Sequence, residues 1–190
     1  IEMKRLPVYL LFISAVFLSC KDNQIGSALT SAEISMNDRP ETSLEVLESI
    51  DKNLLSTRKQ KAKYALLYSM ALDKNYIDIK ADSIIAPAVE YYECHGTKEE
   101  RFLCNYYNAR IYENAGDNEN ALLYAAKAES IDTSKIPAEN KCLLYAMKGR
   151  IYHNDWRITE AIDSYKMACD YAVESERYRH YVYYLLKLAD

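Results

Sequence analysis

The chain has 190 residues, of which 49% are apolar and 27% are charged, a balance that is ordinary for a soluble protein. Its net charge of −4, with no basic stripe, argues against nucleic-acid binding, and no run of 18 apolar residues that could span a bilayer is present. Only four glycines and four prolines interrupt the chain, which favours long helices. The 18 tyrosines, against three phenylalanines and one tryptophan, suit half-buried helix faces.

The first twenty residues have the pattern of a signal peptide. A short basic start at residues 3–5 precedes 13 apolar residues, 6–18, a run too short to cross a membrane as a helix. The run ends in FLSC at residues 17–20, which resembles the lipobox of bacterial lipoproteins, although Phe17 and Leu18 depart from its usual pattern. The resemblance predicts lipidation of Cys20 and cleavage before it, and the alternatives are an ordinary cleaved secretion signal or an uncleaved anchor.

The lipid predicted on Cys20 and the residue that follows it indicate where the mature chain is located. Several acyl chains on one cysteine hold a protein firmly on a membrane, whereas one chain holds it weakly. Lys21 follows the cysteine where an aspartate would stand in proteins kept at the inner membrane, so the resemblance favours the outer membrane. We therefore expect a membrane-anchored lipoprotein of the cell envelope, at the outer membrane or the periplasmic face, with a linker at residues 21–26.

From residue 27 onward the apolar residues recur with the period of amphipathic helices, and no strand period is found. The fold class predicted is all-α. Pro87 places a helix start near Ala86 or a kink in that helix, and Thr97 with Glu100 forms a capping box. The expected helix pairs cover about residues 27–55, 58–94, 98–131 and 138–174, and a further helix begins near residue 176.

A six-residue phrase occurs twice in the chain. ARIYEN at residues 109–114 returns as GRIYHN at residues 149–154, and the offset of 40 residues continues downstream into a pair of alanines, Ala121 and Ala161. Within each copy a small residue is followed by tyrosine after three positions and by alanine after nine more. Small residues at these spacings allow two helices to approach closely, while the tyrosine fills the space between them.

This spacing resembles the tetratricopeptide repeat. The resemblance implies a right-handed superhelix of antiparallel helix pairs, because one pair cannot bury its apolar face alone and stacking leaves a concave groove lined by the first helix of each pair. The close-contact position of the second helices would be held by four small residues, namely Ser43, Ala88, Ala121 and Ala161. The repeats are divergent, since Trp156 stands where Gly116 makes the turn in the earlier copy. Together with the signal, the chain resembles tetratricopeptide-repeat lipoproteins of Gram-negative bacteria.

In each copy one arginine follows the small residue, and these two arginines would turn toward the groove. Arg110 and Arg150 could hold an acidic group of a bound segment between them. The other candidates for the groove lie within one or two turns of these arginines: Tyr106, Asn114, His153 and Asn154. The alternative is that each arginine pairs with a local glutamate such as Glu113 and only stabilises the stack.

The remaining polar residues do not predict catalysis or a cofactor. No Cys-x-x-Cys motif, zinc-ligand spacing, nucleophile–base arrangement or glycine-rich phosphate loop is present, so we expect no enzyme activity, no metal and no cofactor. Cys94 and Cys104 flank one tight turn and are the only plausible sequence-near disulfide pair, the alternative being free cysteines that pack as small apolar residues.

The expected function is that of a non-enzymatic scaffold, anchored to the cell envelope by a lipid, which binds a protein or peptide segment in its groove. The alternative is the extracytoplasmic sensor portion of a longer membrane-bound transcriptional regulator or histidine kinase, and a carbohydrate-binding lipoprotein is a third possibility. The sequence ends within the apolar-periodic segment YVYYLLKLAD, so we expect the natural chain to continue.

Overall fold

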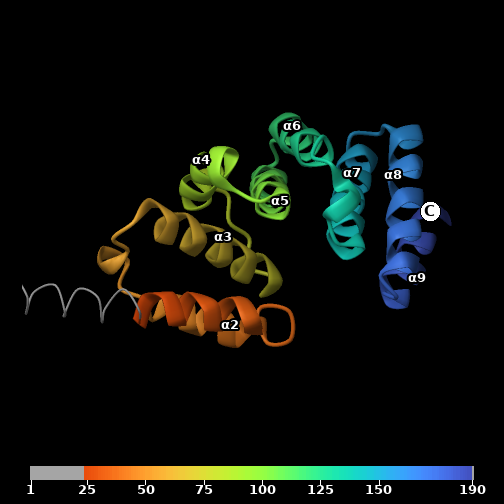
Figure 1. The fold of residues 1–190 in the computed structure, drawn as a ribbon. Coiled ribbons are helices and arrows are strands. Elements are labelled where there is room, and N and C mark those ends of the chain that lie inside the picture. Colours follow the sequence, from red (N-terminus) through yellow and green to blue (C-terminus); the bar gives the residue numbers. More distant parts are fainter. Residues whose placement is uncertain (1–23, 190) are drawn as a thin grey trace, which may run out of the picture. The chain divides into compact units, whose positions relative to one another are not determined.

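The computed structural model describes residues 24–189, apart from the side chains of Thr133 and Ala189. The predicted signal peptide and Cys20 lie outside this range. Within it all regular structure is helical, which confirms the all-α prediction (Figure 1). Residues 24–35 are helical, and the helices that follow are α2 Pro40–Glu48, α3 Arg58–Lys74, α4 Ala86–His95, α5 Lys98–Ala115, α6 Asn118–Glu129, α7 Ala138–Asn154, α8 Ile158–Glu174 and α9 Tyr178–Ala189. Three short 3-10 turns lie at η2 Lys52–Leu54, η3 Asp82–Ile84 and η4 Thr133–Lys135.

The chain divides into two compact units, the first ending at Ile77 and the second beginning at Asp78. In the described part of the first unit, the helix at residues 24–35 packs with α2 and α3. Its buried core is apolar and includes Leu29, Ala32, Met36, Leu47, Leu67 and Ala71. Ser43 of α2 is fully buried, and its hydroxyl donates to the carbonyl oxygen of Ala32 at 2.8 Å. A small polar residue therefore sits where two helix backbones come close, as the sequence predicts.

The helix starts of the first unit correct the predicted linker. Residues 21–26 were expected to form it, but the first helix already includes residues 24–26. α2 has Pro40 in its first turn, and its N-cap residue Arg39 makes no side-chain capping bond. Thr57, in contrast, caps α3 through its hydroxyl and the side chain of Gln60. The first unit thus depends on packing at α2 and on a capping box at α3.

The second unit is built from consecutive helices that pack in pairs. α4 packs on α5, α5 on α6, α7 on α8 and α8 on α9, while α7 also contacts α5 and α6. α4 starts at Ala86 with Pro87 in its first turn, and the predicted capping box of Thr97 and Glu100 starts α5. α7 and α8 have the bounds expected from the sequence, 138–154 and 158–174.

The spacing of 40 residues extends beyond the two copies of the six-residue phrase. α3, α5, α7 and α9 begin at Arg58, Lys98, Ala138 and Tyr178, each 40 residues after the one before. The turns after α3, α5 and α7 share a residue with positive φ at the same spacing, namely Tyr76, Gly116 and Trp156. The four small residues predicted at the helix contacts, at positions 43, 88, 121 and 161, are all buried. These regularities are compatible with a helical repeat.

Stacked tyrosine rings join successive helices in the second unit, which accounts for much of the tyrosine excess. Tyr112 of α5 stacks on Tyr124 of α6 with ring centroids 5.5 Å apart, and Tyr145 of α7 stacks on Tyr171 of α8 at 5.6 Å. Tyr165 of α8 stacks on a ring of α9 at 6.3 Å. The rings of the first two stacks are half-buried, whereas both rings of the third are buried. A half-buried tyrosine ring covers apolar area while its hydroxyl can reach water or a polar partner, which phenylalanine cannot do.

Candidate binding face of helices α5 and α7

The first helices of the two copies lie side by side, and an ion bridge joins them. The guanidinium of Arg150 in α7 donates from Nε to Glu113 Oε1 of α5 at 3.0 Å and from a terminal nitrogen to Oε2 at 3.1 Å. Arg110, one turn before Glu113 on α5, pairs with the same carboxylate. Glu113 is therefore held by two arginines from adjacent helices, and its side chain is only 14% exposed.

The electrostatics of this bridge favour the charged form of Arg150. Burial of the Arg150 guanidinium opposes its ionisation, but the adjacent Glu113 carboxylate outweighs burial and raises the pKa of Arg150 above its ordinary value. The two arginines and one glutamate leave one excess positive charge on this part of the surface. A bidentate contact of this kind fixes the register of two helices as well as their distance.

Apolar side chains adjoin the ion bridge on both helices. Leu103 precedes Arg110 by seven residues on α5, and Leu143 precedes Arg150 by seven residues on α7. Seven residues are close to two helical turns, so each leucine shares a face with its arginine. Both leucines are half-buried. Because Arg150 reaches Glu113, the two faces adjoin, and we call the surface formed by Leu103, Leu143, Arg110, Arg150 and Glu113 the α5–α7 face.

Four other residues were expected in the groove. Tyr106 is buried, with its ring edge-on to Tyr107 at 4.9 Å, so it contributes to packing. Asn114 is half-buried, and its amide donates to the carbonyl oxygen of Ile79 at 3.4 Å. His153 and Asn154 are exposed at the end of α7. The structure thus brings the two arginines together through Glu113, as in the alternative hypothesis that each pairs with a local glutamate.

A second polar link joins α6 to α7. Glu129 of α6 accepts a hydrogen bond from the hydroxyl of Tyr145 at 2.7 Å and from the ammonium group of Lys148. Burial opposes ionisation of Glu129, but these two donors outweigh burial and hold the pKa of its carboxyl below the usual value. No sequence motif predicts this contact, because the partners are 16 and 19 residues apart and belong to different helix pairs.

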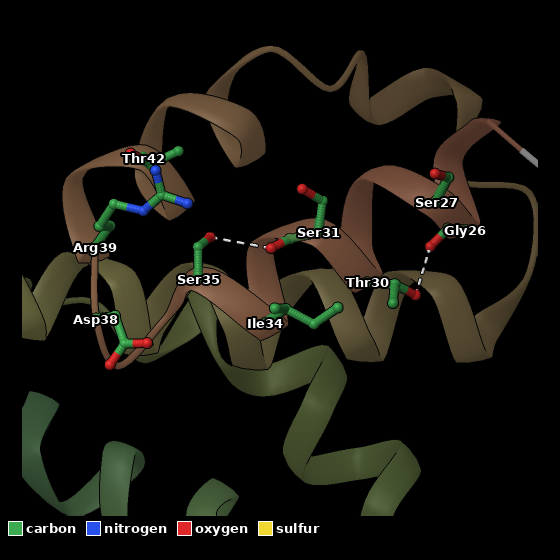
Figure 2. Close-up of a pocket in the computed structure, with 9 residues that line it drawn as sticks. All are labelled: Gly26, Ser27, Thr30, Ser31, Ile34, Ser35, Asp38, Arg39 and Thr42. Atoms are coloured by element: carbon green, nitrogen blue, oxygen red, sulfur yellow. Dashed lines mark hydrogen bonds between the residues drawn. The ribbon is translucent and has the colours of Figure 1, made fainter.

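The first unit contains a hollow of about 520 Å³ between the helix at residues 24–35 and the start of α2 (Figure 2). Several hydroxyl groups line it, but those of Thr30 and Ser35 donate to carbonyl oxygens of their own helix, Gly26 at 2.9 Å and Ser31 at 3.0 Å. Such bonds satisfy these two hydroxyls locally.

The cysteines of the described residues are free. Cys94 is exposed and Cys104 is buried, so the candidate disulfide between them is not formed. Cys142 and Cys169 are also buried, and burial raises the pKa of the Cys142 thiol to about 11, which makes it a poor nucleophile. Among residues 24–189 no group of three or more metal-binding side chains is found, and no helix there is long and apolar enough to cross a membrane.

Comparison of the chain with known protein families, with curated proteins and with solved structures found no match. The likeness to tetratricopeptide repeats therefore rests on the residues of this sequence alone.

Proposed function

We propose that the chain is a non-enzymatic, helical-repeat scaffold that binds a protein or peptide segment on the α5–α7 face. The observation that carries the proposal is the recurrence of one surface pattern on two adjoining helices. A leucine and an arginine seven residues apart stand at the same positions of α5 and α7, and Arg150 reaches across to Glu113. Apolar contacts flanked by a cationic pair suit a segment with apolar and acidic side chains.

Glu113 would compete with an acidic side chain of such a segment for the two arginines. Its carboxylate already fills the position between the two arginines, so an acidic side chain of the ligand has to share or displace it. The Leu103 and Leu143 side chains supply apolar area that does not depend on this competition. The ligand class that follows is a short segment with two apolar anchors and at least one carboxylate.

Selection from a phage-displayed random peptide library on the immobilised chain tests this proposal, with affinities then measured by fluorescence anisotropy. We expect selected peptides to be acidic and apolar, and Leu143→Asp to weaken their binding by about tenfold or more. Glu113→Gln removes the competing carboxylate and should strengthen binding of the acidic peptides. The matched control is Leu123→Asp on α6, whose leucine is 50% exposed and lies off this face. Equal loss in both aspartate variants, or no selected peptide, would overturn the proposal.

The anchor is part of the same proposal. A lipid on Cys20 would hold the scaffold at the envelope and present the α5–α7 face to partners there. Intact-mass measurement of the protein purified from bacterial membranes should show a chain beginning at residue 20 with the mass of attached acyl chains. The Cys20→Ala variant should lose this mass and leave the membrane fraction. Finding a mature chain without attached lipid would refute the lipid anchor, but it would not bear on binding at the α5–α7 face.

A further inference from the structure

A hollow of about 220 Å³ lies between α7 and α8. Its volume is below the roughly 300–1,000 Å³ of pockets that bind drug-sized ligands, so it suits a group the size of one ring. The residues that line it include three of α7 and three of α8: Tyr145, Lys148, Tyr152, Glu160, Asp163 and Ser164. The α7 residues lie on a different stripe of that helix from Leu143 and Arg150, so the hollow is separate from the α5–α7 face.

The internal repeat explains why this hollow exists. Tyr152 corresponds to Tyr112 of α5, and Ser164 corresponds to Tyr124 of α6, each at an offset of 40 residues. In the earlier copy the two tyrosine rings stack, with their centroids 5.5 Å apart. Serine at position 164 brings no ring, and both Tyr152 and Ser164 line the hollow. The place that the second ring fills in the earlier copy is therefore open in the later one.

Two polar side chains of the hollow lack a partner among the described residues. Ser164 is only 6% exposed, and its hydroxyl makes no hydrogen bond there. Asp163 forms no ion pair within the same part of the chain. The other two charged groups are paired, Glu160 with Arg157 at 2.7 Å and Lys148 with Glu129. The hollow thus offers an unpaired hydroxyl and an unmatched negative charge, which favour a cationic ligand.

α9, the last described helix, packs on a different side of α8. Its contacts with α8 include the stack of Tyr184 on Tyr165 and the approach of the Tyr181 carbonyl oxygen to the Cys169 thiol at 4.0 Å. Positions 165 and 169 share one stripe of α8, whereas positions 160 and 164 share another. The stripe that lines the hollow is therefore not the one that α9 covers.

We propose that this hollow binds an aromatic ring that carries a cationic amine close to it, as in tyramine or in a tyrosine beside a lysine of a peptide. The ring would lie beside Tyr152, in the place that Tyr124 takes in the earlier copy. The amine would lie near Asp163, and the Ser164 hydroxyl would gain a partner in the ligand. Stacking of rings and attraction of a cation to aromatic and acidic groups both favour such a ligand.

A nuclear magnetic resonance titration of the ¹⁵N-labelled chain with tyramine tests the proposal. We expect saturable shifts of the amides around positions 152 and 164, with a dissociation constant of about 1 mM or tighter. 4-Ethylphenol, which lacks the ammonium group, should bind about three- to fivefold more weakly. Asp163→Asn should remove this difference. The matched control is Asp170→Asn, an exposed carboxylate of the same helix that does not line the hollow, which should preserve it.

Ser164→Tyr supplies the missing ring from the chain itself. It should weaken tyramine binding by about tenfold or more while circular dichroism shows the helices kept, and Leu143→Asp on the α5–α7 face should leave this binding unchanged. The peptide acetyl-Ala-Tyr-Lys-Ala-amide, titrated in the same way, separates two sources of the ligand. Tighter binding of the peptide assigns the hollow to a protein segment, and tighter binding of tyramine assigns it to a free amine.

Three results would refute the inference. One is the absence of saturable shifts around positions 152 and 164 with both tyramine and the peptide. Another is unchanged tyramine binding in a folded Ser164→Tyr variant. The third is an undiminished preference for tyramine over 4-ethylphenol in Asp163→Asn, and this comparison decides the question even if Ser164→Tyr does not fold.

Discussion

The packing of the Tyr165 ring of α8 against α7 depends on the absence of a side chain at Gly149. A Cβ atom built there would lie 2.7 Å and 2.8 Å from two ring carbons of Tyr165, nearer than real contacts allow. Alanine normally favours a helix interior over glycine by about 1 kcal/mol, but here the ring would have to move. We expect Gly149→Ala to lower the free energy of unfolding by about 1–3 kcal/mol, measured by urea denaturation.

Gly26 provides the matched control for helix propensity. It lies in the helix at residues 24–35, and a Cβ atom there meets no heavy atom within 4 Å. Gly26→Ala should leave stability unchanged or raise it. If both alanine variants behaved alike, the close approach at Gly149 would be refuted.

Trp156 occupies a backbone conformation that suits glycine. Its φ is +59°, it is 86% exposed, and Gly116 has φ +78° in the equivalent turn of the preceding copy. A bulky residue in the left-handed region is strained by roughly 1–2 kcal/mol, and little packing offsets it here. We expect Trp156→Gly to raise the free energy of unfolding by about 0.5–1 kcal/mol, and Gly116→Ala to lower it by about 1 kcal/mol. Destabilisation by Trp156→Gly would show instead that the indole makes an important contact.

At the scale of elements, the ion bridge at Glu113 ties α5 to α7. Glu113→Gln keeps the shape of the side chain but leaves two half-buried arginines without their common carboxylate. We expect a loss of about 1–2 kcal/mol in the free energy of unfolding, measured by urea denaturation. The control is Glu160→Gln in the exposed pair with Arg157, which should leave the melting temperature unchanged. A large effect at Glu160 and none at Glu113 would contradict this assignment.

Glu129 gives the link between α6 and α7 a pH dependence. Its pKa is lowered in the folded state, so the unfolded chain binds a proton there more readily. The stability that it contributes is present above the ordinary pKa of 4.5 and is lost as the pH falls through the folded pKa. Melting temperatures followed from neutral pH to about pH 3 should fall less steeply in Glu129→Gln than in the parent chain. Identical slopes would exclude this carboxylate as a source of acid sensitivity.

Helix bounds and caps could be predicted from the sequence, whereas the contacts between helices could not. The bounds of α7 and α8 and the cap at Thr97 follow from local patterns, so the sequence predicts them correctly. The predicted linker runs to residue 26, whereas the helix already includes residues 24–26. The contact of Arg150 with Glu113 and that of Tyr145 with Glu129 join residues of different helices that are 37 and 16 positions apart, and no local spacing predicts them.

At the scale of the molecule, the two units show different outer surfaces. The first contains a hollow lined in part by hydroxyl groups, of which those of Thr30 and Ser35 bond within their own helix, while the second presents the α5–α7 face. In the second unit a leucine and an arginine recur 40 residues apart on α5 and α7, so the surfaces of these two helices carry matching side chains.

The central claim is that a bound segment lies on the α5–α7 face, and hydrogen–deuterium exchange read by mass spectrometry tests it most directly. The full chain would be compared with and without a peptide selected on it. We expect slower exchange in α5 and α7 around Leu103–Glu113 and Leu143–Arg150, with little change in α6. Protection confined to α6, or to the hollow beside residues 24–35, would contradict the claim.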